Sequence, residues 1–162
     1  MAPAMWPTAH TPAVRRVAFL IVYAAAPVLA RHHSQMVVMA RILIVDDDAA
    51  SASSLVRILQ DSGYGDTRVV RSAATALRAA IDFDPGIIFV DIELPDMTGY
   101  DVALLLHQHP HRRLQHMRLI ALTDNTEHLG RERARMSGFE RYLVKPVSAA
   151  ALLDVLSVPR RH

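Results

Sequence analysis

The chain has 162 residues, of which 51% are hydrophobic and 21% are charged, so its composition fits one globular domain and argues against a disordered chain. It contains no cysteine, which excludes a disulfide scaffold, a thiolate metal site and a thiol nucleophile. The net charge of +2 derives from the first 38 residues, which hold three Arg and no acidic residue. The remainder is nearly neutral and offers no clustered basic face, so we expect no nucleic-acid binding.

The first 38 residues differ from the rest of the chain in composition. Three prolines and the pair Arg15-Arg16 precede an uncharged run over 17–30. This run is shorter than the roughly 20 apolar residues that span a bilayer, so we expect no membrane crossing. Three interpretations stay open for the extension: a start placed upstream of the true first residue at Met39, a poorly ordered tail, or an export signal or membrane anchor. We expect the folded domain to span 39–162 and leave 1–38 out of the fold argument.

From Met39 onward, short apolar runs alternate with longer stretches of helical periodicity. The run over 41–45 is rich in β-branched residues without alternation, which is typical of a strand buried on both faces. In chain order we expect a strand over 41–45, a helix around 55–59 that ends at Ser62-Gly63, a strand over 67–71, a helix over 73–83, a strand over 86–90, a helix over about 100–107, a strand over 119–122, a helix over about 126–137, a strand over 142–144 and a helix over 149–156.

Five strands that alternate with five helices predict an α/β fold with one doubly wound parallel sheet. Parallel strands need crossover connections, and right-handed crossovers place helices on both faces of the sheet. Only residues 157–162 follow the last expected helix, so we expect a single domain that stands alone.

Polar residues end four of the five expected strands. Asp46 and Asp47 follow the first strand, Asp91 the third, Thr123 the fourth and Lys145 the fifth. In a doubly wound sheet these strand ends share one edge, where the ligand crevice lies. An acidic residue after a strand often caps the next helix, and a single Lys before Pro is usually solvated. Together, however, these side chains predict a functional site with three carboxylates, a hydroxyl and an ammonium group.

The segments that carry these residues resemble the receiver domain of two-component response regulators. The matching stretches are 41–48 (Arg-Ile-Leu-Ile-Val-Asp-Asp-Asp), 90–99 (Val-Asp-Ile-Glu-Leu-Pro-Asp-Met-Thr-Gly), 121–123 (Ala-Leu-Thr) and 142–147 (Tyr-Leu-Val-Lys-Pro-Val). The resemblance covers essentially all of 40–158. It implies the flavodoxin-like strand order 2-1-3-4-5, which is known for the chemotaxis receiver.

The resemblance also implies a Mg²⁺ site. Asp47 is expected to bind the ion directly, Asp46 through water, and Asp91 and the backbone carbonyl of Glu93 as further ligands. The physical chemistry agrees, because three converging carboxylates repel one another and a hard divalent cation with oxygen ligands relieves that repulsion.

The same resemblance assigns the remaining roles. Asp91 corresponds to the phosphoacceptor, and Thr123 and Lys145 to the groups that bind phosphoryl oxygens. Tyr142 corresponds to the aromatic residue that changes rotamer on activation, after Thr123 draws its loop toward the phosphoryl group. This is a two-state switch driven by local charge.

The implied function is a stand-alone signalling switch that catalyses its own phosphorylation and dephosphorylation and is otherwise not an enzyme. The donor is a histidine kinase or a histidine phosphotransfer protein, the output is binding to a downstream protein, and the location is the cytoplasm. An alternative is an interaction module that keeps the fold without phosphorylation, which the complete set of site residues argues against. A phosphotransferase of the HAD type needs Asp-x-Asp after the first strand, whereas Asp46 and Asp47 are consecutive.

Three further features need an interpretation. Four histidines between the third helix and the fourth strand are interrupted by Pro110, so we expect a solvated connection and no metal site; they are His107, His109, His111 and His116. The arginines of the fourth helix and its sequel favour a charged outer face over an anionic partner; they are Arg131, Arg133, Arg135 and Arg141. Asp124 stands where the family usually has a small residue, so we expect either a charged gate at the acceptor or a helix cap.

Overall fold

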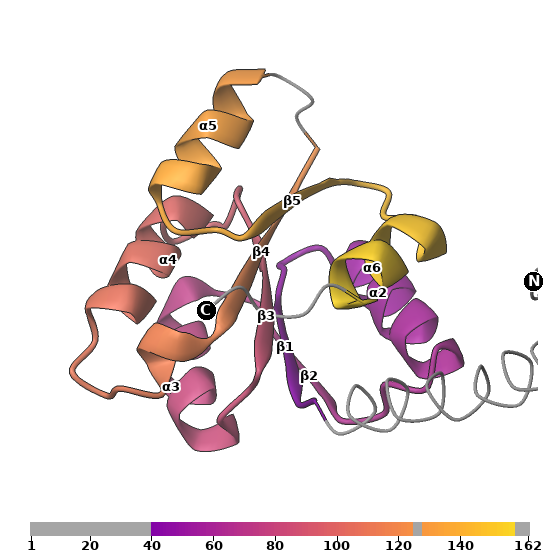
Figure 1. Cartoon of the computed structure of the whole chain (residues 1–162), viewed down its shortest axis with the longest axis horizontal. Coiled ribbons are helices and arrows are strands. Elements are labelled where there is room, and N and C mark those ends of the chain that lie inside the picture. The colour runs from indigo at the N-terminus through magenta and orange to yellow at the C-terminus, as the bar shows by residue number, and fades with distance from the viewer. Residues whose placement is uncertain (1–39, 125–127, 158–162) are drawn as a thin grey trace, which may run out of the picture. The chain divides into compact units, whose positions relative to one another are not determined.

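The computed structural model describes residues 40–124 and 128–157, so the extension 1–38 and its interpretations lie outside the described residues. The elements are β1 (Ile42–Val45), α2 (Ala49–Asp61), β2 (Thr67–Val70), α3 (Ala73–Phe83), β3 (Ile87–Asp91), α4 (Gly99–Gln108), the 3₁₀ turn η1 (Leu114–His116), β4 (Arg118–Thr123), α5 (His128–Met136), β5 (Arg141–Val144) and α6 (Ala149–Ser157). Strands and helices therefore alternate as predicted (Figure 1).

The five strands form one parallel sheet in the order β2-β1-β3-β4-β5. This order confirms the prediction that came with the family resemblance. The central strands β1 and β3 are buried along their whole length, whereas β2 at the edge is partly exposed. The continuous apolar runs of β1 and β3 fit this burial, because helices cover both faces of the sheet.

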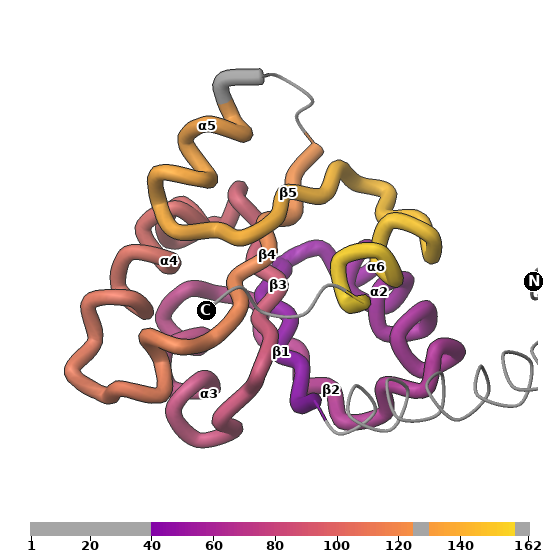
Figure 2. Tube along the Cα trace, viewed as in Figure 1, coloured from indigo at the N-terminus to yellow at the C-terminus, as the bar shows by residue number. Residues whose placement is uncertain are grey.

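The sheet separates two hydrophobic cores, which the alternation along β1 illustrates. Leu43 and Val45 belong to the core under α3, α4 and α5, and Ile42 and Ile44 belong to the core under α2 and α6. The Cα trace shows the same two layers on opposite sides of the sheet (Figure 2). Among the described helices, none has the length and hydrophobicity that a membrane crossing requires.

Side-chain caps define where three of the helices begin. Asp48 accepts a hydrogen bond from the Ala50 N–H, Ser72 caps α3, and Thr98 accepts from the Asp101 N–H at the start of α4. Each cap satisfies a backbone donor that has no partner within the helix. The cap of α2 lies next to the end of β1, and the cap of α4 ends the loop that follows Asp91, so the two caps fix where the chain enters each helix near the functional edge.

The structure differs from the prediction at some element boundaries. Asp91 and Thr123 are the last residues of β3 and β4 rather than the residues after them, since the ladder continues through the Asp91–Leu122 pair. The short turn at Leu114–His116 was not predicted. Its single apolar residue, Leu114, is buried, but one residue creates no periodicity that a sequence pattern could show.

Candidate functional site

The carboxyl ends of β1 and β3 bring three carboxylates together. One oxygen from each of Asp46, Asp47 and Asp91 lies within 4.8 Å of the others. Asp46 and Asp91 are buried, with exposed fractions of 1% and 4%, while Asp47 is exposed. The pairing of β1 with β3 in parallel register explains this convergence, because Val45 and Val90 are partners and the acidic residues follow them. The structure thus assembles the acidic cluster that the strand ends predicted.

Lys145 joins this cluster from the end of β5. Its Nζ atom lies 2.6 Å from Oδ2 of Asp91 and 3.2 Å from Oδ2 of Asp46. Burial works against the charge of the ammonium group, but the hydrogen bonds and charges of the two carboxylates outweigh it and raise the pKa of Lys145. Lys145 therefore stays protonated and supplies the positive charge of the site.

Burial shifts the pKa of Asp91 in the direction opposite to its effect on Lys145. Burial raises its pKa, and the charge of Asp46 raises it further. The hydrogen bond and charge of Lys145 and a hydrogen bond from the Glu93 N–H to Oδ1, at 3.0 Å, offset only part of this effect. One ammonium group serves two buried carboxylates, so the site has unsatisfied affinity for a further cation.

Asp46 is held in place by the first turn of α2. Its Oδ2 accepts a hydrogen bond of 2.7 Å from the Ser51 hydroxyl, and its Oδ1 accepts one of 3.0 Å from the Asp48 N–H. Sequence reasoning missed Ser51. The signal was available, because a hydroxyl in the first turn of the helix that follows β1 lies next to the end of that strand.

The loop between β3 and α4 is fixed by contacts at both of its ends. Glu93 pairs with Thr98 across an antiparallel bridge, and the Gly99 N–H donates to the Ile92 carbonyl at 2.9 Å. A Cβ atom on Gly99 would collide with the backbone carbonyl of Asp91, so only glycine permits this close approach. The family motif thus has a physical reason at Gly99.

Asp96, at the tip of this loop, was not singled out from the sequence. Its two carboxylate oxygens accept hydrogen bonds from the N–H groups of Ala73, at 3.0 Å, and Ala74, at 2.9 Å. These bonds at the N-terminus of α3 lower the pKa of the exposed Asp96 carboxyl. Asp96 therefore ties the loop that follows the acceptor to a neighbouring helix.

Thr123 and Tyr142 reach the site from β4 and β5. Thr123 is buried, and its carbonyl accepts a hydrogen bond of 2.8 Å from the Lys145 N–H. Tyr142 is half-buried in the neighbouring strand, where it pairs in register with Ala121. Thr123, Tyr142 and Glu93 line one cavity of about 520 Å³ beside the acceptor loop. The residues that the sequence analysis assigned to the site thus all lie at one edge of the sheet.

The histidines near the end of α4 and the residue Asp124 lie outside the acidic cluster. Among the described residues, the only group of three or more potential ligand side chains within reach of one ion is the acidic cluster. His107 places Nε2 3.2 Å from the Gly138 carbonyl, and His109 accepts from the His111 N–H. Asp124 is exposed and lines a pocket of about 310 Å³ together with Lys145.

The donor set fits a magnesium-type ion. Three carboxylates that lie close together offer the oxygen ligands that hard divalent cations prefer, and the exposed position of Asp47 leaves a route from solvent. A carboxylate beside such an ion, next to a protonated lysine and a buried hydroxyl, is suited to nucleophilic attack on a phosphoryl group.

The family model, a curated relative and solved structures that match this chain are all response regulators or receiver domains. The model of the response regulator receiver domain family matches residues 42–157. The polar-differentiation response regulator DivK of Brucella ovis is 32% identical over 99 residues, which cover 61% of this chain and 78% of DivK. The structure of the chemotaxis response regulator CheY4 of Vibrio cholerae has a TM-score of 0.66 and 26% identity, covering 73% of this chain and 96% of CheY4. A CheY-like receiver domain protein from Methanospirillum hungatei has a TM-score of 0.64 and 29% identity, covering 72% of this chain and 90% of its own.

Proposed function

The chain belongs to the response regulator receiver domain family, and from this premise we propose that it is a phosphorylation-controlled signalling switch with Asp91 as its phosphoacceptor. The observation that carries this proposal is the meeting of Asp91 with two further carboxylates and with Nζ of Lys145 at 2.6 Å. A protein that uses the fold only as an interaction surface has no need for buried carboxylates, which are costly unless they are paired.

We assign Mg²⁺ to the acidic cluster. Asp47 would bind it directly, Asp46 through water, and Asp91 and the backbone carbonyl of Glu93 would complete the protein ligands. When bound, the ion supplies positive charge that screens the carboxylates and binds a phosphoryl oxygen. The hydrogen bonds from Ser51 and the Asp48 N–H orient Asp46 for this task.

The chain's own residues then carry out the transfer. A carboxylate oxygen of Asp91 attacks phosphorus, a new O–P bond forms, the P–N bond of the phosphohistidine breaks, and its electron pair leaves with the imidazole. The ammonium group of Lys145 exchanges its contact with Asp91 for a phosphoryl oxygen. The Thr123 hydroxyl binds a second phosphoryl oxygen, and both contacts stabilise the charge that spreads over the equatorial oxygens. In dephosphorylation, water attacks phosphorus, a new O–P bond forms, the O–P bond to Asp91 breaks, and phosphate leaves while Asp91 returns to a carboxylate. Both steps take place on the protein's own side chain.

The family suggests the partners. Receiver domains take the phosphoryl group from a histidine kinase or a histidine phosphotransfer protein, and we propose such a donor here, with a downstream protein as the reader of the switched surface. Because phosphodonors of this kind are found in the cytoplasm, we propose that location. We assign the whole of this function to residues 39–162.

Intact-mass measurement with acetyl phosphate tests the assignment. The chain should gain one phosphoryl group only when MgCl₂ is present, Asp91→Asn should gain none, and Asp47→Asn should gain much less. Asp154→Asn is a matched control, because Asp154 is an exposed carboxylate on α6, outside the cluster. Equal labelling of Asp91→Asn and the unaltered chain would refute the assignment, and no labelling of the unaltered chain would favour the unphosphorylated interaction module.

A further inference from the structure

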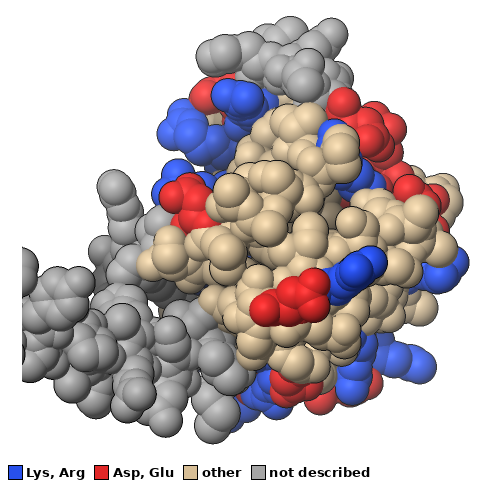
Figure 3. All heavy atoms as spheres, turned by 90° about the vertical axis from the view of Figure 1, so that its right-hand side faces the viewer, with Lys and Arg blue, Asp and Glu red and all other residues tan. Residues whose placement is uncertain are grey.

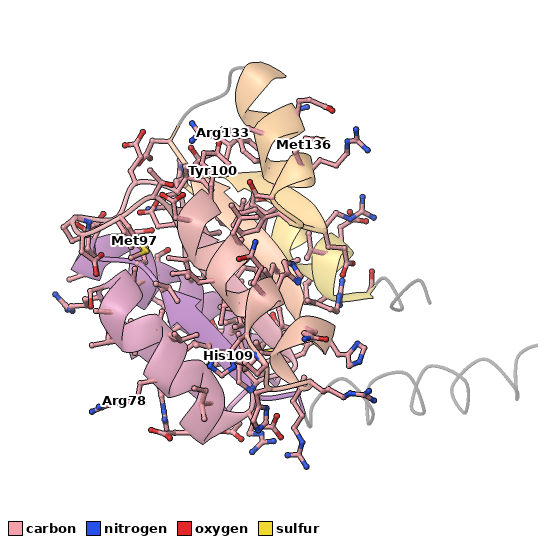
Figure 4. The ribbon with its side chains drawn as sticks, turned by 90° about the vertical axis from the view of Figure 1, so that its left-hand side faces the viewer. Arg78, Met97, Tyr100, His109, Arg133 and Met136 are labelled. Carbon is pink, nitrogen blue, oxygen red and sulfur yellow. The ribbon has the colours of Figure 1, made fainter. Side chains whose placement is uncertain are left out.

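Two tyrosine hydroxyls meet beneath α5 at a single glycine. Tyr100, in the first turn of α4, donates a hydrogen bond of 3.3 Å to the carbonyl of Gly130 in α5. A Cβ atom on Gly130 would lie 2.9 Å from the Tyr142 hydroxyl and 3.7 Å from the Tyr100 hydroxyl. Because Gly130 has no side chain, the Tyr142 hydroxyl can lie where a Cβ atom would crowd it, while the Tyr100 hydroxyl binds the backbone of α5. Figure 4 shows Tyr100 pointing from α4 toward α5, next to Arg133.

The same two rings carry arginines of α5. The guanidinium carbon of Arg133 lies 4.4 Å from the ring centroid of Tyr100, and that of Arg131 lies 5.9 Å from the ring centroid of Tyr142. Both distances fall within the range of cation–π contacts. Tyr100 therefore contacts α5 through its ring as well as through its hydroxyl, and Tyr142 contacts α5 through its ring and places its hydroxyl beside Gly130.

The described side chains of α5 bury little apolar surface. Of the α5 side chains that the structure describes, which belong to residues 130–136, only Ala134 is buried. A single alanine buries little apolar area, so the tyrosine contacts carry a large share of the attachment of residues 130–136. Tyr100 itself is fixed from below, because it is buried and its ring meets Phe139 edge to face at 6.4 Å.

We propose that Tyr100 is a positioning residue that couples the position of α5 on the sheet to the position of the Tyr142 side chain. The Tyr100 hydroxyl holds the Gly130 carbonyl, and the Tyr142 hydroxyl fills the space that the absent Cβ leaves; a movement of Tyr142 therefore changes the packing on which α5 rests. This inference rests on the proposed function, in which Tyr142 moves when Asp91 is phosphorylated. It extends that function by naming a second tyrosine, Tyr100, that links Tyr142 to α5.

Burial is consistent with this role for the hydroxyl. It raises the pKa of Tyr100, and the neighbouring Tyr142 and Glu93 raise it further, against a lowering effect of Arg133. The hydroxyl is thus protonated at neutral pH and remains a hydrogen-bond donor to Gly130.

Hydrogen exchange of the α5 amides tests the coupling. In the chain without any phosphoryl group, Tyr100→Phe should speed exchange in α5 several-fold, and the response of α5 to beryllofluoride with Mg²⁺ should shrink. Combining Tyr100→Phe with Tyr142→Phe should add little to either single change, because both remove parts of one contact. Tyr64→Phe is the control, since Tyr64 is equally buried in the opposite core under α2 and α6.

A second substitution, Gly130→Ala, should change the exchange rate of α5 in the direction opposite to that expected from helix propensity. Alanine normally favours a helix over glycine and slows exchange, but Gly130→Ala should speed exchange in α5, because its Cβ displaces the Tyr142 hydroxyl. In the Tyr142→Phe background the same substitution should slow exchange. Unchanged α5 exchange in Tyr100→Phe, additive effects in the double variant, or slower exchange in Gly130→Ala alone would overturn the proposal. Mass labelling of Asp91 in the same samples reports the proposed function separately, and the exchange rates measured without beryllofluoride test Tyr100 even if labelling fails.

Discussion

The helices α5 and α6 lie on opposite faces of the sheet beside β5, have nine residues each, and are attached in different ways. α6 buries Leu152, Val155 and Leu156 in the core, whereas α5 buries Ala134 among its described side chains and relies on polar and aromatic contacts. The surface of α2 and α6 is largely uncharged in Figure 3, while α5 exposes three arginines. Hydrophobic burial gives one fixed position, but hydrogen bonds and stacked cations exchange partners at low cost. From this difference we predict that a local charge change at the site moves α5 more readily than α6.

The largest expected effect is on the free energy of unfolding, which substitutions in α6 and α5 should lower by different amounts. Leu152→Ala should lower the free energy of unfolding by about 2–5 kcal/mol, because it removes fully buried methyl groups and leaves a cavity. Arg133→Ala should lower it by at most about 1 kcal/mol, since it removes an exposed cation–π contact. Urea unfolding measures both values. Equal losses would show that α5 is attached as firmly as α6 and would remove the basis of the comparison.

Asp124 should control how fast Asp91 is phosphorylated by a small donor. Asp124 lines the pocket beside Lys145, and a carboxylate about 4 Å from an incoming phosphate repels it by about 1 kcal/mol in bulk water. We predict that Asp124→Ala speeds acetyl phosphate labelling and beryllofluoride binding several-fold, with a smaller gain at high salt.

The alternative interpretation of Asp124 makes a different prediction. If Asp124 serves only as a cap, the substitution should lower the melting temperature and leave both rates unchanged. A protein donor that brings its own cationic side chains should gain less from Asp124→Ala than acetyl phosphate does.

The smallest effect concerns Asp96, which ties the acceptor loop to α3. Asp96→Ala should lower the melting temperature by a few degrees at neutral pH, because two N–H groups lose their acceptor. The folded state lowers the pKa of Asp96, so its stabilisation is present above the ordinary carboxyl value of roughly 3.9 and is lost as the pH falls through the lowered value. Thermal melts from pH 6 downward should therefore show the two chains converging below pH 4. A difference that persists at low pH would mean that the loop is held by other contacts.

Sequence and structure agree most closely where local patterns determine the outcome. Apolar runs and helical periodicity predicted the alternation, and strand ends predicted that Asp46, Asp91 and Lys145 would meet. The strand order itself came from the family resemblance. Asp96 and Tyr100 could not be found in this way, because their partners lie 23 and 30 residues away and depend on how α3 and α5 pack. Contacts between elements need the tertiary structure, whereas residues at strand ends need only the topology.

The most direct test follows backbone amide shifts by NMR while beryllofluoride and Mg²⁺ are added to the unaltered chain. Phosphoryl chemistry at Asp91 that is transmitted to α5 predicts large shift changes in the last turn of α5, at Arg133–Met136, and small ones in the last turn of α6, at Asp154–Ser157. Asp91→Asn should show neither. Changes confined to the residues around Asp91, or changes of equal size in both helices, would contradict the switch as described.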